Sequence, residues 1–318
     1  MKNGIFVGVD TSNYTTSVGV VDTDGAILAN LKLPLPVKCG ERGLRQSDAV
    51  FAHVKNLPVI MDELKEYTVG KTILGVGVST RPRNKEGSYM PCFLAGVGIA
   101  TAIATSSGAP LYEFSHQCGH IMAAIRSAEV DVPKRFAAFH ISGGTTELVD
   151  ALWNGKDFVC DTLGGTSDLN AGQIIDRVGV YMGMPFPSGK YMEAAALKNK
   201  DKIPKKKVSV SGTNANLSGL ENMATKLYDE TKNIELTAAF VFEYLGAAIV
   251  KVCENAKDTI GDVPFVFAGG VMSNSIIKEK LSSKFNAIFA EPELSKDNAV
   301  GVAILAKNAY NYNKRTEA

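Results

Sequence analysis

The sequence predicts an α/β protein made of two related lobes, and three observations lead to that prediction. Apolar strand-like stretches alternate along the chain with helical ones, which is the pattern of α/β proteins. A strand–loop–strand unit at residues 8–25 recurs at 140–155 with an offset of 130 residues. The 318 residues are also enough for about two domains. We therefore expect one lobe at residues 1–130 and the other at 131–318.

The two copies of the repeat share their loop residues and their turn dipeptides. The matching positions are Ser12 with Ser142, Thr15-Thr16 with Thr145-Thr146, and Asp24-Gly25 with Asn154-Gly155. Asp-Gly and Asn-Gly are typical of two-residue hairpin turns in which both central residues have positive φ. We therefore expect each lobe to open with a hairpin.

The other elements follow from hydrophobic periodicity. It predicts helices at 47–67, 92–106, 116–127, 171–183, 235–257 and 298–310, a strand at 71–80, and a strand with a glycine turn at 265–274. The lysine-rich stretch at 197–210 is expected to be an exposed connector.

Composition limits the classes of function and the compartment. Thirty-four basic and thirty-three acidic side chains leave a net charge of +1, so a polyanionic partner would need a local basic patch. Five scattered cysteines without a CxxC pair argue against a disulfide framework and for a reducing compartment. The first ten residues read as a strand, and the uncharged stretch at 88–112 reads as a buried helix interrupted by prolines. We expect a cytoplasmic protein with no membrane association.

Three loops rich in Gly, Ser and Thr follow apolar strands: Thr11-Ser12, Ser142-Gly143-Gly144-Thr145-Thr146, and Gly269-Gly270. Glycine allows a ligand to approach the backbone, and successive N–H groups bind anions. Tight turns without a ligand are the alternative. There is no Walker P-loop and no GxGxxG motif, so a nucleotide site would be of another type.

Two histidines one helical turn apart, His116 and His120, form a second candidate site. Positions i and i+4 share a helix face, so both imidazoles can reach one metal ion. Two histidines without a ligand are the alternative. No glutamate follows the first histidine, which excludes the HExxH protease pattern. Asp176, in an apolar helix, points either at a ligand ribose or at the neighbours of Arg177.

With these motifs in view, the sequence resembles the tRNA threonylcarbamoyl-adenosine transferases, long known as the glycoprotease family. The resemblance runs from about residue 8 to residue 306. It is carried by HQCGH (116–120), ISGGTTELV (141–149), LGGTSDLNAGQIIDRVGVYMGMPFPSG (163–189), LSGLE (217–221), FAGGVMSN (267–274) and PELSKDNAVG (292–301). It implies the duplicated actin-like and sugar-kinase-like ATPase fold, with a nucleotide cleft between two lobes.

The resemblance also implies a set of site residues. Its metal ligands fall on His116, His120 and Asp297, a set suited to iron or zinc. Its nucleotide contacts fall on the 142–146 loop, Asp176, Gly189, Gly269, Gly270 and Asn274. Asp10, at the end of the first strand, occupies the position where such folds place a catalytic carboxylate, although a turn aspartate is the alternative.

Several positions depart from the family pattern. Thr145 replaces the usual histidine of the phosphate loop, and Asn13-Tyr14-Thr15 replace acidic residues of the first loop. A short Gly-Pro-Gly stretch is replaced by the longer basic segment STRPRNKEGSYMP (79–91), and GTNAN is inserted after residue 211. A divergent paralogue with a different acceptor is therefore an alternative to the tRNA enzyme.

The implied activity is metal-dependent transfer of a threonylcarbamoyl group from an acyl-adenylate to an adenosine amine in tRNA, with release of AMP. The implied partners are tRNA, a small paralogous dimerisation protein and an ATPase. Candidate phosphate contacts are Arg81, Arg83, Lys85 and the lysines of 198–207. The alternatives are an ATPase or phosphotransferase of the same superfamily, and a non-catalytic paralogue that binds nucleotide and a protein partner.

Overall fold

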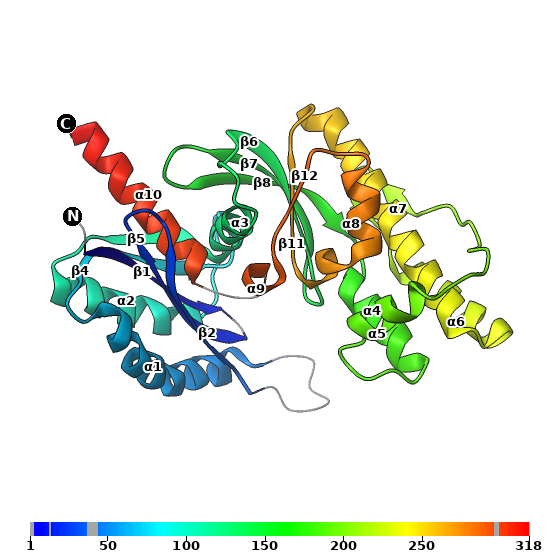
Figure 1. Cartoon of the computed structure of the whole chain (residues 1–318), viewed down its shortest axis with the longest axis horizontal. Helices are drawn as coiled ribbons and strands as arrows, with labels where there is room; N and C mark the ends of the chain where they lie inside the picture. The colour runs from blue at the N-terminus through cyan, green and yellow to red at the C-terminus, as the bar shows by residue number, and fades with distance from the viewer. Residues whose placement is uncertain (1–2, 13, 37–43, 296–298, 318) are drawn as a thin grey trace. The chain divides into compact units, whose positions relative to one another are not determined.

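The computed structural model describes residues 3–12, 14–36, 44–295 and 299–317 (Figure 1). The chain forms two compact units. One comprises Met1–Val132, Trp153–Val159 and Glu293–Ala318, and the other comprises Pro133–Leu152 and Cys160–Pro292. The C-terminal helix therefore belongs with the first unit, whereas the sequence-based division assigned all of 131–318 to the second lobe.

In the described part of the chain, the first unit has a five-stranded sheet of order β3-β2-β1-β4-β5. Its strands are β1 (Gly4–Ser12), β2 (Thr15–Asp22), β3 (Ile27–Pro34), β4 (Thr72–Arg81) and β5 (Leu111–Ser115). β1 to β3 are antiparallel, while β4 and β5 run parallel to β1. The helices are α1 (Gln46–Thr68), α2 (Phe93–Ser107), α3 (His116–Ser127), the short α9 (Pro292–Ser295) and α10 (Val300–Glu317).

The second unit repeats this topology. Its sheet has the order β12-β11-β6-β7-β8-β10-β9. Read in the opposite direction, the strands β8-β7-β6-β11-β12 correspond one by one to β3-β2-β1-β4-β5 of the first sheet. They are β6 (Arg135–Ile141), β7 (Thr146–Trp153), β8 (Phe158–Thr166), β11 (Phe265–Ala268) and β12 (Ala287–Phe289), followed at the edge by β9 (Val210–Ser211) and β10 (Asn214–Ala215). The predicted duplication is confirmed at the level of strand order.

The helices of the second unit surround a long buried one. They are α4 (Ala171–Tyr181), α5 (Gly189–Ala196), α6 (Ser218–Thr231), α7 (Ile234–Ile260), the 3-10 helix η1 (Gly270–Ser273) and α8 (Ser275–Ser282). Length and composition alone would allow α7 to cross a membrane, but most of its apolar window is buried inside this unit. It therefore reads as a core helix.

The two hairpin turns differ from the prediction. Gly25 and Gly155 have φ of 89° and 97°, but Asp24 and Asn154 are not among the described residues with positive φ. In the first turn, the Gly25 N–H donates to the Asp22 carbonyl. Only the glycine therefore takes the left-handed conformation, as in the longer hairpin loops that place one glycine after an ordinary turn.

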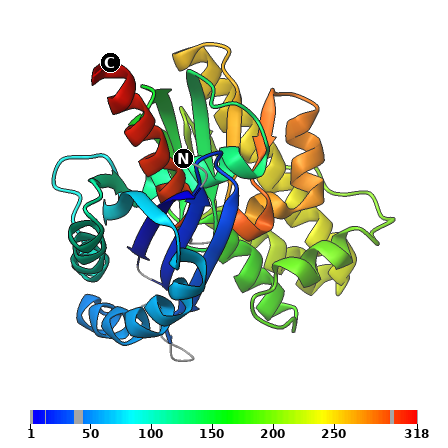
Figure 2. The same ribbon diagram turned by 60° about the vertical axis from the view of Figure 1, so that its left-hand side comes forward.

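Both faces of the first sheet are covered by helices, as Figure 2 shows from a second direction. The odd-numbered residues of β1, among them Val7 and Val9, lie in a core with residues of α1 and α2. On the other face, Gly8 and Gly19 leave room for the backbone of Ala299 and Val300, where α10 begins. α10 continues to Glu317, beyond the predicted end at 310, although its last buried residue is Ala309. The prediction followed the apolar residues and therefore ended where they end.

The helix that carries the histidine pair crosses α10 at a contact between glycines. A Cβ at Gly301 would collide with the Gly119 carbonyl and reach within 2.8 Å of the Ala123 nitrogen. Backbone from α10 therefore fills the space beside α3, and this contact fixes where α3 lies on the sheet.

We expect Gly301→Ala to lower the free energy of unfolding by about 1–3 kcal/mol, because the added methyl meets backbone that has no room to move. Gly98→Ala is the matched control, since it lies in α2 with nothing near its Cβ position. That variant should gain roughly 0.5–1 kcal/mol from helix propensity. Urea unfolding measures both, and equal stability of the two variants would contradict the packing argument.

Candidate functional site

The carboxyl end of β1 presents two polar side chains to opposite faces of its sheet, because side chains alternate along a strand. Thr11 faces α2, where its hydroxyl donates to the Cys92 carbonyl at 2.9 Å and accepts from the Gly96 N–H at 3.0 Å. Asp10 faces the other way and is 1% exposed. Its Oδ1 accepts from the Ser12 N–H at 2.9 Å, which leaves Oδ2 for a second partner.

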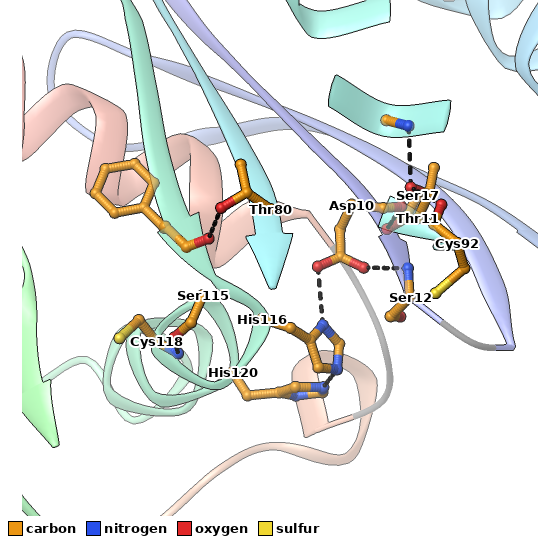
Figure 3. A network of polar contacts seen from close by, with 12 residues as sticks. Asp10, Thr11, Ser12, Ser17, Thr80, Cys92, Ser115, His116, Cys118 and His120 are labelled. Carbon is orange, nitrogen blue, oxygen red and sulfur yellow. Dashed lines mark hydrogen bonds and ion pairs between the residues drawn. The ribbon is translucent and has the colours of Figure 1, made fainter. Parts of the chain in front are cut away.

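That second partner is His116, the first residue of α3. Figure 3 shows Asp10 between Ser12 and His116, with Oδ2 at 2.8 Å from Nδ1 of the imidazole. The Nε2 atoms of His116 and His120 face each other at 2.9 Å, and the two rings are nearly perpendicular. The predicted pairing on one helix face is therefore present, and it extends to Asp10.

This arrangement fits two ligands of one metal ion. Two nitrogens about 2.1 Å from an ion lie about 3 Å apart when the angle between them is near 90°. A carboxylate on the remote nitrogen of a ligating histidine fixes the ring and its tautomer, and Asp10 has this position. Among the described residues, however, no group of three His, Cys, Asp or Glu is placed to hold a metal. The predicted third ligand, Asp297, lies outside the described residues.

The structure adds a buried histidine that the sequence did not single out. His53 on α1 is 0% exposed and lies 2.8 Å from the Thr16 hydroxyl through Nδ1. Burial lowers its pKa, opposed by the Ser12 carbonyl and the charge of Asp10. Its place on the buried face of a predicted helix was the only signal available, and that signal is shared by every core residue.

Cys92 also lies beside this end of β1. Burial, followed by the charge of Asp10, raises the pKa of its thiol to about 11. A thiol with this pKa is protonated near neutral pH, so Cys92 is not suited to act as a nucleophile.

In the second unit, the loop between β6 and β7 has the form of an anion-binding turn. The Ser142 hydroxyl accepts from the N–H groups of Gly144 and Thr145 at 3.3 and 3.1 Å. Gly143 and Gly144 are exposed, with open space where a Cβ would project. Thr146 is buried and accepts from the Ala171 N–H at the start of α4. A phosphate can approach this backbone closely.

Strand pairing brings the second glycine loop beside the first. β11 runs parallel to β6 with Ala268 opposite His140, so the loops that follow them are neighbours. Gly269 has φ of 97°, and a Cβ there would collide with the Ile141 carbonyl. Asn274 caps α8 by accepting from the Ile277 N–H at 3.0 Å. Its buried Nδ2 has no partner within the described part of the chain, which leaves a donor available for a ligand.

Asp176 lies beside the start of α5, where Gly189 is the first residue. Asp176 Oδ1 accepts from the Ser188 N–H at 2.7 Å, directly before Gly189 at the start of α5. Burial raises the pKa of Asp176, and the Ser188 hydrogen bond opposes this. Asp176 therefore faces the α4–α5 connection and binds the Ser188 N–H there, rather than the neighbours of Arg177.

The predicted site residues that the structure describes thus fall into one set in the first unit and two sets in the second. Asp10, His116 and His120 lie together in the first unit, and Ser142 to Thr146 lie beside Gly269 and Gly270 in the second. Asp176 and Gly189 are joined through Ser188.

Solved structures with this fold include nucleotide-binding enzymes. An activator of 2-hydroxyisocaproyl-CoA dehydratase from Clostridium difficile matches with a TM-score of 0.53 and 15% identity, covering 98% of this chain and 97% of that one. A ROK family glucokinase from Streptomyces griseus matches with a TM-score of 0.54 and 13% identity, covering 96% and 99%. These likenesses establish the actin-like and sugar-kinase-like fold.

Sequence relatives give the family. The tRNA N6-adenosine threonylcarbamoyltransferase of Streptococcus suis is 27% identical, over 98% of this chain and 94% of the relative. That of Neorickettsia sennetsu is 27% identical over 95% and 93%. The family model for tRNA N6-adenosine threonylcarbamoyltransferase matches residues 41–304. The chain belongs to the tRNA N6-adenosine threonylcarbamoyltransferase family.

Proposed function

We propose that this transferase moves a threonylcarbamoyl group from an acyl-adenylate to the N6 amine of an adenosine in tRNA and releases AMP. A divalent metal, iron or zinc, is held by His116, His120 and Asp297. The observation that carries the metal site is the Asp10–His116–His120 chain, in which two Nε2 atoms converge at 2.9 Å behind a buried carboxylate.

The residues of the first unit prepare a donor set. Asp10 accepts the Nδ1 proton of His116, so the lone pair of that ring lies on Nε2, the atom that would ligate a cation. The Ser12 N–H holds the other carboxylate oxygen and stops the side chain from rotating. When bound, the metal polarises carbonyl or phosphate oxygens of the donor as a Lewis acid.

The residues of the second unit provide the nucleotide side of the proposal. The open backbone at Gly143 and Gly144 would let the phosphate reach the Gly143 amide, while the Gly144 N–H stays on the Ser142 hydroxyl, and the Asn274 Nδ2 would donate to the adenosine. Two of the solved neighbours were determined with ADPNP and AMPPNP, and these titles support a nucleotide in this fold.

The transfer needs no protein nucleophile. The N6 amine of the acceptor attacks the carbonyl carbon of the donor, a C–N bond forms, the bond from that carbon to the phosphate oxygen breaks, and AMP leaves. The amine loses one proton to solvent or to the leaving phosphate. The rate then depends on positioning and on charge stabilisation.

The reaction is tested with the purified protein, tRNA and threonylcarbamoyl-adenylate. We expect mass spectrometry of the digested tRNA to show threonylcarbamoyl-adenosine, with one AMP released per modified nucleoside. The double variant His116→Ala/His120→Ala should lose at least about 100-fold of the rate, the effect of removing charge stabilisation from a site.

Other outcomes would replace the proposal. ADP formed from ATP without a modified nucleoside would indicate a phosphotransferase or ATPase. No transfer by the unmodified protein, together with partner binding that survives the double substitution, would indicate a non-catalytic paralogue.

Asp10→Asn tests the role of the carboxylate. The amide keeps the size of the side chain but removes the charge that orients His116, so metal affinity should fall about 10- to 100-fold. A zinc titration against a competing chelator measures this. Asp62→Asn is the control, because Asp62 is an exposed residue of α1 paired with Lys65. Equal affinity of the two variants would remove Asp10 from the proposed site.

The lysine-rich connector is the proposed contact with tRNA phosphates. Lys205, Lys206 and Lys207 are exposed in a segment without regular structure. Changing all three to alanine should weaken tRNA binding and reduce the slope of log K against log salt by about 2, at roughly 0.7 per lost contact. The control replaces the exposed Lys55, Lys65 and Lys71 of the first unit. Binding of the unmodified protein that does not change with salt would contradict the assignment.

A further inference from the structure

The two ends of the segment between β4 and α2 lie at the histidine site. Near its start, the Pro82 carbonyl accepts from the Gln117 N–H at 3.0 Å, next to His116. At its end, the Cys92 carbonyl accepts from Thr11, next to Asp10. The segment therefore connects the helix that carries the histidines with the strand that carries their carboxylate.

Asn84, in this segment, makes side-chain contacts to several other parts of the first unit. Its Oδ1 accepts from Arg81 Nη2 at 2.8 Å. Its Nδ2 donates to the Phe158 carbonyl at 2.9 Å and to Cys118 Sγ at 3.1 Å. One amide therefore joins the end of β4, the first turn of α3 and the first residue of β8.

The surroundings of Asn84 are polar and partly buried. Arg81 also donates to the Thr80 hydroxyl at 3.0 Å, so its guanidinium is held on the sheet. Burial raises the pKa of Asp157, while the Phe158 N–H, Cys118, the Arg81 charge and Asn84 oppose that rise. Cys118 is itself 0% exposed. Hydrogen bonds in such a cluster cannot be exchanged for water without cost.

Cys118 and the histidines lie on different sides of α3. Residues two positions apart are about 200° apart around a helix, whereas positions four apart share a face. Figure 3 shows Cys118 directed to one side of α3 and the two imidazoles to the other. Contacts on one face to Asn84 and on the opposite face to Asp10 fix the rotation of the first turn.

We propose that Asn84 is a positioning residue for the histidine pair. By holding Cys118 Sγ and the Phe158 carbonyl, it fixes the rotation of the first turn of α3 and so keeps His116 Nδ1 on Asp10. The inference rests on the proposed function in that both concern the same pair of histidines.

The test uses the metal-free protein and the hydrogen-bonded Nδ1 proton of His116, followed by NMR in protein labelled with ¹⁵N-histidine. We expect Asn84→Ala to speed exchange of this proton with water at least tenfold, because the ring no longer stays on Asp10. Cobalt affinity, measured by titration, should fall at least about tenfold, as for other groups that orient a ligand.

Two further variants separate positioning from general stability. Asn84→Asp keeps the acceptor for Arg81 but loses the donor to Phe158 and Cys118, so it should behave like Asn84→Ala. Glu86→Ala changes a nearby exposed residue of the same segment and should leave both measurements within twofold. If Asn84→Ala does not fold, Cys118→Ala removes the thiol that Asn84 holds, together with the thiol's own contact to the Phe158 carbonyl, and should shift both measurements in the same direction.

A lower unfolding midpoint of Asn84→Ala with unchanged proton exchange and cobalt affinity would overturn the inference and leave Asn84 a purely structural residue. Neither measurement uses tRNA or the acyl donor. A protein that fails to modify tRNA would therefore refute the proposed function without deciding the role of Asn84, and the reverse also holds.

Discussion

The hydrogen bond between Asp10 and His116 is the interaction on which the site depends. Asp10 is almost fully buried, and a buried carboxylate is costly unless its oxygens have donors. The Ser12 N–H supplies one donor and the imidazole supplies the other. This requirement links the end of a central strand to the first turn of α3 and directs the remaining nitrogen of His116 toward His120.

The duplicated topology explains why candidate site residues gather at the ends of strands. In each unit, the first strand ends beside a parallel neighbour, β4 in one case and β11 in the other. Side chains and loops at those carboxyl ends therefore converge without any special local sequence. One copy places a carboxylate and two imidazoles there, and the other copy places exposed glycine amides. The two copies of the sheet therefore carry chemically different groups at the carboxyl ends of their corresponding strands.

The segment from residue 82 to residue 92 differs from the family pattern but keeps its contacts with the two elements that carry the histidine site, α3 and β1. Its backbone bonds to α3 and β1, while Asn84 reaches behind α3 to Cys118. The exposed part of the same segment includes Lys85 and Tyr89. A change in sequence here can therefore alter the surface beside the histidines while their attachment to the sheet is kept.

The sequence by itself determined the α/β class, the repeat, the long helices and the pairing of His116 with His120, because each of these follows from periodicity or from spacing within one element. It also predicted that the glycine loops follow strands. The tertiary structure decided that Asp10 meets His116, that Asp176 meets the Ser188 N–H, and that α10 packs on the first sheet. It also decided the contacts of His53 and Asn84. These contacts join residues from 12 positions apart, for Asp176 and Ser188, to 291 positions apart, for Gly8 and Ala299 (299 − 8), and no local pattern records them, because they depend on which elements pack together.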